Sequence, residues 1–352
     1  MTVLITGGAG FIGQHLARRL VADGHSVLAL DTLLGQVHVD PQASVAAFPG
    51  PVIVGDVADA SAWTDLPQVN AVVHLAAETG TGQSMYEVER YHRVNVEGTA
   101  RAGAFAADRG IPLVALSSRA VYGEGRHGCL IHGVAFGAPC CAHTAPEASR
   151  EADPHHPVSV YGETKSEGEA ALGPVGAAVP VTIIRPQNVI GPGQALHNPY
   201  TGVLAAFLAM LKEGKPLTLY GAGTQTRDFL HVEDLAALIA WALATPPQPG
   251  RPRVLNAGSG VRTTLLELAR YAAAGAPVPT YGITHLDIHR AGDIDHACAD
   301  LTLVRAVGAP LPRWTTADAV ADFVAASWDK TGAPASAWDG ALGELRERGL
   351  TS

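Results

Sequence analysis

The chain has 352 residues, a formal net charge of −9 and 47% apolar residues, so it is long enough to bury a large core. It contains no run of basic residues, which argues against nucleic acid as a partner, and no apolar stretch long enough to span a membrane. The first apolar run is a short strand followed by glycines rather than a leader peptide. We therefore expect a cytoplasmic protein without a membrane partner.

The first predicted strand covers residues 2–6 and leads into the glycine-rich segment 7–13. Apolar residues at helical spacing follow directly, so the local order is strand, glycine turn and helix. This order is typical of a dinucleotide-binding site. We expect Gly8 and Gly10 to let the backbone approach a pyrophosphate at the helix N-terminus, and Gly13 to let the helix lie close to the sheet.

The second predicted strand, 26–30, ends in Asp31, eighteen residues after Gly13. A carboxylate at this point suits the ribose hydroxyls of NAD and repels the additional phosphate of NADP. No lysine or arginine occurs between Arg19 and Arg90 that could reverse the preference. The sequence therefore predicts NAD as the cofactor.

Short Val/Ile/Leu runs alternate with alanine-rich amphipathic segments through the rest of the first half, which predicts a parallel sheet covered by helices. Asp56 ends one of these strands, where we expect it to meet the adenine edge. Ser118 ends another, at the sheet edge where doubly wound folds bind ligands. The predicted strands are 51–57, 71–77, 112–118 and 181–185, and a predicted helix runs from about 85 to 108.

The predicted fold class is α/β, with a Rossmann doubly wound parallel sheet and a smaller α/β C-terminal region. We assign residues 1–186 to an NAD-binding domain with an insertion at about 124–156. Residues 187–352 are assigned mainly to a substrate-binding region, with some segments returning to the first domain. In this second part we predict strands near 217–220 and 253–256 and helices near 203–213, 233–244, 264–274 and 316–328.

Tyr161 and Lys165 are four residues apart, which puts the phenol and the ammonium on one face of a helix. The lysine would favour the phenolate and lower the tyrosine pKa toward neutrality, giving a general base for an alcohol. Such pairs also occur on many solvated helices. The presence of Ser118 some forty residues earlier favours the catalytic interpretation.

Several motifs together resemble the extended short-chain dehydrogenases/reductases that act on nucleotide sugars, in order and over nearly the whole chain. The segments 78–86, 117–125, 198–202 and 290–293 most resemble the group of dTDP-L-rhamnose 4-epimerase-like and UDP-hexose 4-epimerases. The family motifs are Thr6-Gly-Gly-Ala-Gly-Phe-Ile-Gly13, His74-Leu-Ala-Ala77, Ser117-Ser118 before Val121-Tyr122-Gly123, Tyr161-x3-Lys165, Arg185-Pro-Gln-Asn188 with Gly191-Pro192, and Arg227-Asp-Phe-Leu-His-Val-Glu-Asp234.

The resemblance implies epimerisation at C4 of a nucleotide-diphosphate sugar through a transient 4-keto intermediate. Tyr161 would move the hydroxyl proton, Ser118 would bind the C4 oxygen, and Lys165 would lower the tyrosine pKa and bind the nicotinamide ribose. Related dehydratases, decarboxylases and 3,5-epimerases need further acid, base or cysteine groups directly after the serines. Arg119 and Ala120 stand there instead.

The resemblance also assigns contacts to a tightly bound NAD and to the substrate, and we expect a homodimer. The predicted NAD contacts are Gly7, Gly10, Phe11, Ile12, Gly13, Asp31, Asp56, Val57, Leu75, Ala76, Ala77, Asn95, Ser117, Tyr161 and Lys165. The predicted substrate contacts are Glu78, Ser118, Asn188, Arg227, Arg290 and Asp293. Arginines suit the diphosphate because each can donate a forked pair of hydrogen bonds to it.

Two other functions remain open at this point. One is an NAD(P)-dependent 4-ketosugar reductase, against which Asp31 argues, since such reductases commonly prefer NADPH. The other is a non-catalytic dinucleotide-sensing or scaffold protein, which would not need Ser118, Tyr161 and Lys165. Neither the nucleotide base nor the sugar follows from these residues.

Three of the four cysteines lie in the insertion, with the spacing Cys129-x2-His132-x7-Cys140-x2-His143. Two such pairs suit a tetrahedral structural zinc site, the alternative being a histidine-rich loop without a metal. We expect no disulfide in a reducing compartment, and we expect Cys298 to be a packed thiol.

Overall fold

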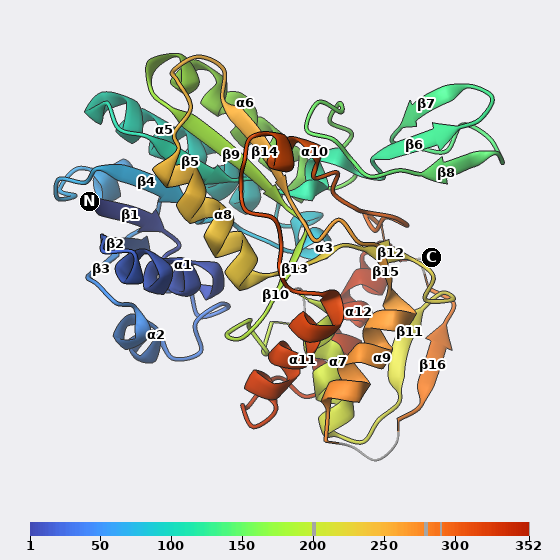
Figure 1. Cartoon of the computed structure of the whole chain (residues 1–352). Helices are drawn as coiled ribbons and strands as arrows, with labels where there is room; N and C mark the ends of the chain where they lie inside the picture. Colours follow the sequence, from blue (N-terminus) through green and yellow to red (C-terminus); the bar gives the residue numbers. More distant parts are fainter. Residues whose placement is uncertain (199–201, 278–280, 289–290, 352) are drawn as a thin grey trace.

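The computed structural model (Figure 1) describes residues 1–198, 202–277, 281–288 and 291–351. Its centre is a parallel seven-stranded sheet with the strand order β14-β9-β5-β4-β1-β2-β3. The order reverses between β1 and β4, which is the switch point where doubly wound sheets bind ligands. The predicted fold class is confirmed. The strands are β1 (Thr2–Thr6), β2 (Ser26–Asp31), β3 (Val52–Val54), β4 (Ala71–His74), β5 (Leu113–Leu116), β9 (Val181–Pro186) and β14 (Arg253–Ala257).

The central strands are apolar on both faces because helices cover both sides of the sheet. In β1, Val3 and Ile5 point to one face, where they join a core with α1 (Phe11–Ala22) and α8 (Val232–Ala244). Leu4 points to the other face. There the core includes residues of α5 (Gly98–Arg109) and α6 (Val160–Ala178).

The helix predicted over 85–108 is a compound element in the structure. It begins with α4 (Val88–His92), passes through a π-helical turn at Arg93–Glu97, and continues as α5. A short helix, α3 (Thr81–Ser84), precedes it. Wide turns of this kind occur frequently at functional sites, and this one contains Asn95.

A second core lies below the sheet in Figure 1, where α7 (Val203–Lys212), α9 (Leu265–Gly275) and α11 (Thr316–Ser327) pack together. Beside them β11 (Leu217–Tyr220) pairs with β16 (Ile283–Leu286). Two later elements, α8 and β14, instead join the large sheet. The domain division at residue 186 remains a prediction.

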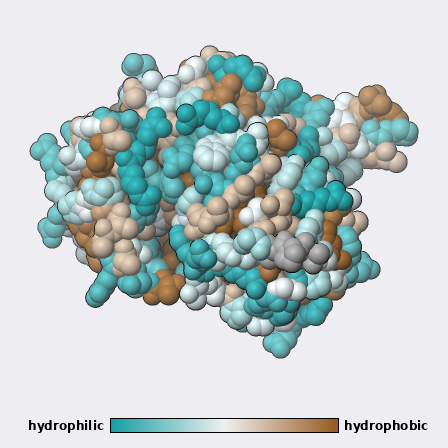
Figure 2. Space-filling model, turned by 60° about the horizontal axis from the view of Figure 1, so that its bottom comes forward, coloured by the Kyte–Doolittle hydropathy of each residue, from teal (hydrophilic) through white to brown (hydrophobic). Residues whose placement is uncertain are grey.

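Between β5 and α6 the chain forms a small antiparallel sheet, β7-β6-β8, which projects from the body (Figure 1). Its strands are β6 (Arg126–Cys129), β7 (Gly133–Phe136) and β8 (Thr144–Pro146). Leu130 at its tip is 95% exposed, and apolar surface is visible on the projection in Figure 2. The other elements are α2 (Pro41–Ala47), β10 (Asn188–Ile190), β12 (Thr226–Arg227), β13 (Phe229–His231), β15 (Thr263–Thr264), α10 (Thr302–Ala306), α12 (Ser336–Glu347) and two short turns, Ala60–Trp63 and Arg119–Tyr122.

Candidate active site

A cavity of about 740 Å³ lies at the carboxyl ends of β1, β2 and β4, beside the glycine turn. The structure brings together at this cavity most of the predicted cofactor contacts and two of the predicted substrate contacts. Those that line it are Gly7, Gly10, Phe11, Ile12, Gly13, Asp31, Asp56, Val57, Leu75, Ala76, Ala77, Glu78, Tyr161 and Asn188. Gln194 and Asn198 also line it, and the sequence analysis did not single them out as contacts.

The glycine turn is tight enough to exclude side chains at several positions. Gly7 has a φ of +65°, and a Cβ there would lie 2.9 Å from the Ala76 backbone nitrogen. A Cβ at Gly8 would lie 2.7 Å from the Ala29 Cβ, so Gly8 is needed for packing against β2 and does not line the cavity. A Cβ at Gly13 would collide with the Gly7 and Gly8 carbonyls. Gly8 therefore allows close packing against β2, and Gly13 lets the first turn of α1 lie close to the glycine turn. The role of Gly8 at a pyrophosphate stays a prediction.

Asp31 lies at the end of β2 and is 7% exposed. Its two carboxylate oxygens accept hydrogen bonds from the backbone of Ala9, at 3.0 Å, and Leu33, at 2.9 Å. These bonds fix the carboxylate against the glycine turn, at the cavity wall. The position suits an acceptor for ribose hydroxyls and disfavours a second phosphate.

Two arginines distant from Asp31 in the sequence also line the cavity. Arg90 pairs with Glu78 at 2.8 Å and also with Glu87, and Arg93 pairs with Asp56 at 2.7 Å. The absence of basic residues near Asp31 in the sequence therefore does not make the cavity free of cations. Both guanidiniums form ion pairs with carboxylates. Asp56 would therefore contact adenine while it is also paired with Arg93.

Tyr161 and Ser118 meet because helix α6 begins directly against the turn that follows β5. Ser159 caps the helix by accepting a hydrogen bond from the Gly162 backbone at 3.2 Å. A Cβ at Gly162 would lie 2.6 Å from the Ala120 carbonyl oxygen, so only glycine permits this approach. The result places the Tyr161 phenol next to the Ser118 hydroxyl.

Burial raises the pKa of the Tyr161 phenol above its usual value, whereas hydrogen bonding with Ser118 and the charge of Arg119 act to lower it. The predicted fall of this pKa toward neutrality, caused by Lys165, does not match the structure. Arg119 is the cation that acts on Tyr161, and among the described residues it makes no hydrogen bond or ion pair. Its position directly after Ser118 was the only sequence signal for this role.

Lys165 is buried in the same helix, and its ammonium donates a hydrogen bond to the Leu116 carbonyl at 2.9 Å. Burial lowers the pKa of Lys165 to about 8, against the opposing charge of Glu169. The ammonium also helps lower the pKa of His74 to about 3, chiefly an effect of burial. Lys165 thus lies at the carboxyl ends of β4 and β5, where it can reach a bound cofactor.

Two predicted cofactor contacts, Asn95 and Ser117, are buried beside the cavity. Asn95 accepts a hydrogen bond from the Glu78 backbone at 2.9 Å and donates one to Thr164 at 3.1 Å. It therefore ties the π-helical turn to α6. The Ser117 hydroxyl, in contrast, has no hydrogen-bond partner among the described residues, although it is fully buried. An unpaired hydroxyl is costly and fits a site completed by a bound group.

Two other predicted substrate contacts, Arg227 and Asp293, lie near Arg119 and do not line the cavity. Arg227 donates to the backbone carbonyls of Ile294, at 2.7 Å, and Asp295, at 3.2 Å. Burial and the charge of Arg227 lower the pKa of Arg119 to about 10, with Tyr161 and Asp293 opposing them. Arg119, Arg227 and Asp293 therefore form one group next to Tyr161. The predicted contact Arg290 lies outside the described residues.

The predicted metal ligands lie in the projecting sheet and do not line the cavity. Cys129, His132 and Cys140 converge as expected, but the fourth group beside them is the sulfur of Cys141. His143 lies outside this group of four, with its Nδ1 at 4.0 Å from the Cys141 sulfur. The adjacent cysteine replaces the predicted histidine because residues 140 and 141 both face the β6–β7 turn.

The sheet order, the glycine turn and the set of Ser118, Tyr161 and Lys165 define a dinucleotide-dependent enzyme of the short-chain dehydrogenase/reductase type. The chain matches the model of the NAD dependent epimerase/dehydratase family over residues 3–258, and it belongs to that family. The resemblance found in the sequence is confirmed.

Proteins that are similar to this chain over nearly its full length are named as nucleotide-sugar 4-epimerases. A dTDP-L-rhamnose 4-epimerase of Burkholderia thailandensis is 38% identical over 338 residues, covering 89% of this chain and 91% of the relative. A UDP-glucose 4-epimerase of Mycolicibacterium smegmatis is 30% identical, covering 92% of this chain and 97% of the relative. The structure of the Thermus thermophilus UDP-glucose 4-epimerase complex with NAD superposes with a TM-score of 0.79 at 26% identity, covering 94% of this chain and 100% of that one.

Proposed function

We propose that this protein is an isomerase that inverts C4 of a nucleotide-diphosphate sugar, using tightly bound NAD. The observation that carries the proposal is the contact of Tyr161, which lines the cavity, with the Ser118 hydroxyl, and Arg119 is the cation that acts on this tyrosine. This set can move one proton and stabilise one alkoxide. It offers no further acid or base pair directly after Ser118 for eliminating water.

The described residues fit NAD at three points. Gly7 lets the glycine turn lie against the Ala76 backbone at the cavity wall, Asp31 presents a fixed carboxylate, and Ser117 has a buried hydroxyl without a partner among the described residues. Asp31 and the wall of the cavity would hold the adenosine half, and Ser117 and Lys165 the nicotinamide half. Held there, NAD would supply the hydride acceptor for C4 and the hydride donor for the opposite face of the carbon.

The remaining steps belong to the protein. The Tyr161 phenolate takes the proton of the C4 hydroxyl, while Ser118 donates a hydrogen bond to the C4 oxygen. The positive charge of Arg119 stabilises the phenolate form of Tyr161, because it lowers the pKa of the phenol. After the 4-keto sugar has rotated in the site and presents its other face, the Tyr161 phenol returns the proton to the C4 oxygen. Atoms and charge balance over the cycle, so no external reductant is consumed.

The diphosphate would lie between the cavity and the Arg119–Arg227 group. Asn188 lines the cavity, and Arg227 is held beside Asp293 by backbone carbonyls. Forked guanidinium donors at this point suit phosphate oxygens. Because the relative at 38% identity is named for dTDP-L-rhamnose, this nucleotide sugar is our first candidate substrate.

The proposal is tested with a panel of nucleotide sugars labelled with deuterium at C4. An epimerase returns the hydride it removed, so the C4 epimer should retain the label with no net change in reduced-cofactor absorbance. Loss of the label to solvent, or steady oxidation of added NADH, would instead indicate another reaction, the second being that of a 4-ketosugar reductase.

Cofactor choice has a separate test. Mass spectrometry of the extracted ligand should identify NAD, and Asp31→Ala combined with a nearby arginine should admit NADP by removing the repulsion of its phosphate. Recovery of NADP from the wild-type protein would show that the Asp31 assignment is wrong.

We also propose a homodimer in the cytoplasm. Within the part of the chain that the structure describes, no helix is both long and apolar enough to cross a membrane. Light scattering on the purified protein tests the dimer, and a monomer at micromolar concentration would exclude it.

A further inference from the structure

The projecting sheet β7-β6-β8 has little apolar material to hold it together. Leu130 and Ile131 at its tip are 95% and 62% exposed, and Val134 in β7 is 45% exposed. A short antiparallel sheet without its own hydrophobic core is at best marginally stable in water. Small units of this kind usually need a disulfide or a metal ion.

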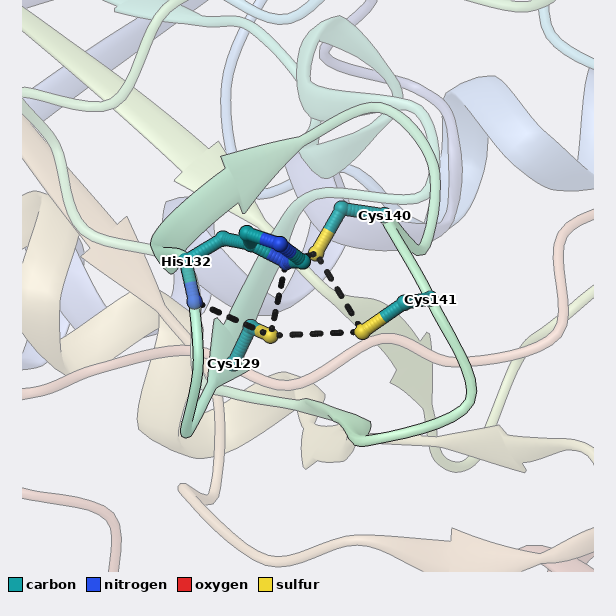
Figure 3. A group of neighbouring side chains, drawn as sticks. All are labelled: Cys129, His132, Cys140 and Cys141. Carbon is teal, nitrogen blue, oxygen red and sulfur yellow. Dashed lines mark hydrogen bonds between the residues drawn. The ribbon is translucent and has the colours of Figure 1, made fainter.

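Side chains near the β6–β7 turn and from the segment before β8 converge at one point, as Figure 3 shows. Cys129 Sγ lies 3.5 Å from both His132 Nδ1 and Cys141 Sγ. Cys140 Sγ lies 3.6 Å from His132 Nδ1 and 4.0 Å from Cys141 Sγ. All four potential ligand atoms lie within 4.8 Å of one another.

The four distances given above are close to the edges of a zinc tetrahedron. Zinc binds sulfur at about 2.3 Å and imidazole nitrogen at about 2.0 Å, which places sulfurs about 3.8 Å apart and sulfur and nitrogen about 3.5 Å apart. A disulfide between Cys129 and Cys141 would use two of the four groups and give no role to His132, which is equally close to two sulfurs. The arrangement is that of a four-ligand site.

Neighbouring donors point at the same sulfurs. The His132 backbone N–H lies 3.4 Å from Cys129 Sγ, and the Thr144 hydroxyl lies 3.2 Å from Cys140 Sγ. Hydrogen bonds of this kind orient and stabilise metal-bound thiolates. Thr144 also accepts a hydrogen bond from the Cys141 backbone at 3.3 Å, which fixes the Cys140–Cys141 pair.

We propose that Cys129, His132, Cys140 and Cys141 bind one structural zinc ion that holds the projecting sheet together. A site with three thiolates and one imidazole in a tetrahedron favours zinc over the harder divalent cations. Binding releases the protons of the three thiols, so it is favoured by rising pH. Four protein ligands leave no position for a substrate, so the ion takes no part in the reaction.

Elemental analysis and native mass spectrometry of the reduced, full-length protein test the proposal. We expect about one zinc per chain in the wild type and an at least tenfold lower content in Cys141→Ser, whereas the matched variant His143→Ala keeps its metal. Cobalt exchanged into the wild type should show the visible spectrum of tetrahedral thiolate coordination. Retained NAD in Cys141→Ser shows that the body is folded.

Three results would overturn the site. One is no zinc in the reduced wild type even after zinc is added. Another is a wild-type protein purified without reductant that holds no zinc and whose tryptic peptide with Cys129 and Cys141 is lighter by two hydrogen atoms, the mass change of a disulfide. The third is zinc lost in His143→Ala and kept in Cys141→Ser, which would favour the ligand set expected from sequence spacing over the one in the structure.

Discussion

The chain passes from Ser118 to Tyr161 through two regions of very different construction. The proposed catalytic residues lie at the end of a strand of the large sheet and on helix α6, where glycine contacts, a helix cap and a buried ion pair surround them. The projecting sheet between them has an exposed tip and depends on its own polar and sulfur-containing side chains. The contrast shows that Ser118 and Tyr161 are held by the layers around them, whereas the insertion has few apolar contacts of its own, which is why we propose a metal cross-link there.

The largest expected difference between the two regions is in the free energy of unfolding that is lost when an ion pair is removed. Arg185 and Glu169 form a forked pair at 2.8 and 2.6 Å, and their side chains are 4% and 8% exposed. Glu169→Gln should lower the free energy of unfolding by about 3 to 5 kcal/mol, because it leaves a buried guanidinium without its counter-charge. The matched variant Glu147→Gln in the projecting sheet, whose side chain is 45% exposed, should cost about 1 kcal/mol or less. Denaturant unfolding measures both, and equal effects would contradict the comparison.

Tyr161→Phe should lower turnover by about 100-fold or more, the usual scale for removing a general base, while NAD stays bound. Tyr91→Phe is the matched control, since its ring packs edge-on at 6.4 Å from that of Tyr161 and its hydroxyl donates to backbone carbonyls. It should cost about 1 kcal/mol of stability and leave turnover nearly intact. Turnover assays of both variants measure this difference. Near-normal turnover of Tyr161→Phe would show that Tyr161 is not the base.

Arg119→Gln should move the acid limb of the turnover profile to higher pH. The charge of Arg119 lowers the pKa of Tyr161, so its removal raises that pKa, and below it turnover falls about tenfold for each unit of increase. Arg119→Lys, which retains the charge, should shift the limb less. A pH profile that is the same in both variants and the wild type would show that Arg119 does not act on the base.

Removing metal from the projecting sheet should have the smallest effect on the body, about 0.5 kcal/mol or less on its free energy of unfolding. Below the tip, Glu124 accepts a hydrogen bond from the Asp295 backbone at 2.6 Å, near the proposed substrate contacts. We therefore expect KM to rise more than kcat falls after chelation. Steady-state kinetics with and without chelator test this, and a large fall in kcat with an unchanged KM would contradict it.

The sequence by itself determined the strand, glycine turn and helix at the N-terminus, the acid at Asp31, and the Tyr161–Lys165 spacing. These features are local: burial periodicity, glycine conformation and i,i+4 geometry act over a few residues. The spacing of Cys129, His132 and Cys140 also predicted, for the same reason, that these three side chains would converge. The continuous helix over 85–108 was predicted less well, because the wide turn around Asn95 depends on the hydrogen bonds of that residue to Glu78 and Thr164.

Only the tertiary structure decided which charges and thiols meet. It brought Arg90 and Arg93 to the cavity, put Arg119 rather than Lys165 in charge contact with Tyr161, and chose Cys141 over His143. Each outcome depends on how segments pack across the sheet or around a turn, and electrostatic effects follow distance in space. Burial also depends on the tertiary structure, and it raises the pKa of Tyr161 and lowers that of Lys165. The rise for Tyr161 is opposite to the fall that its spacing from Lys165 predicts.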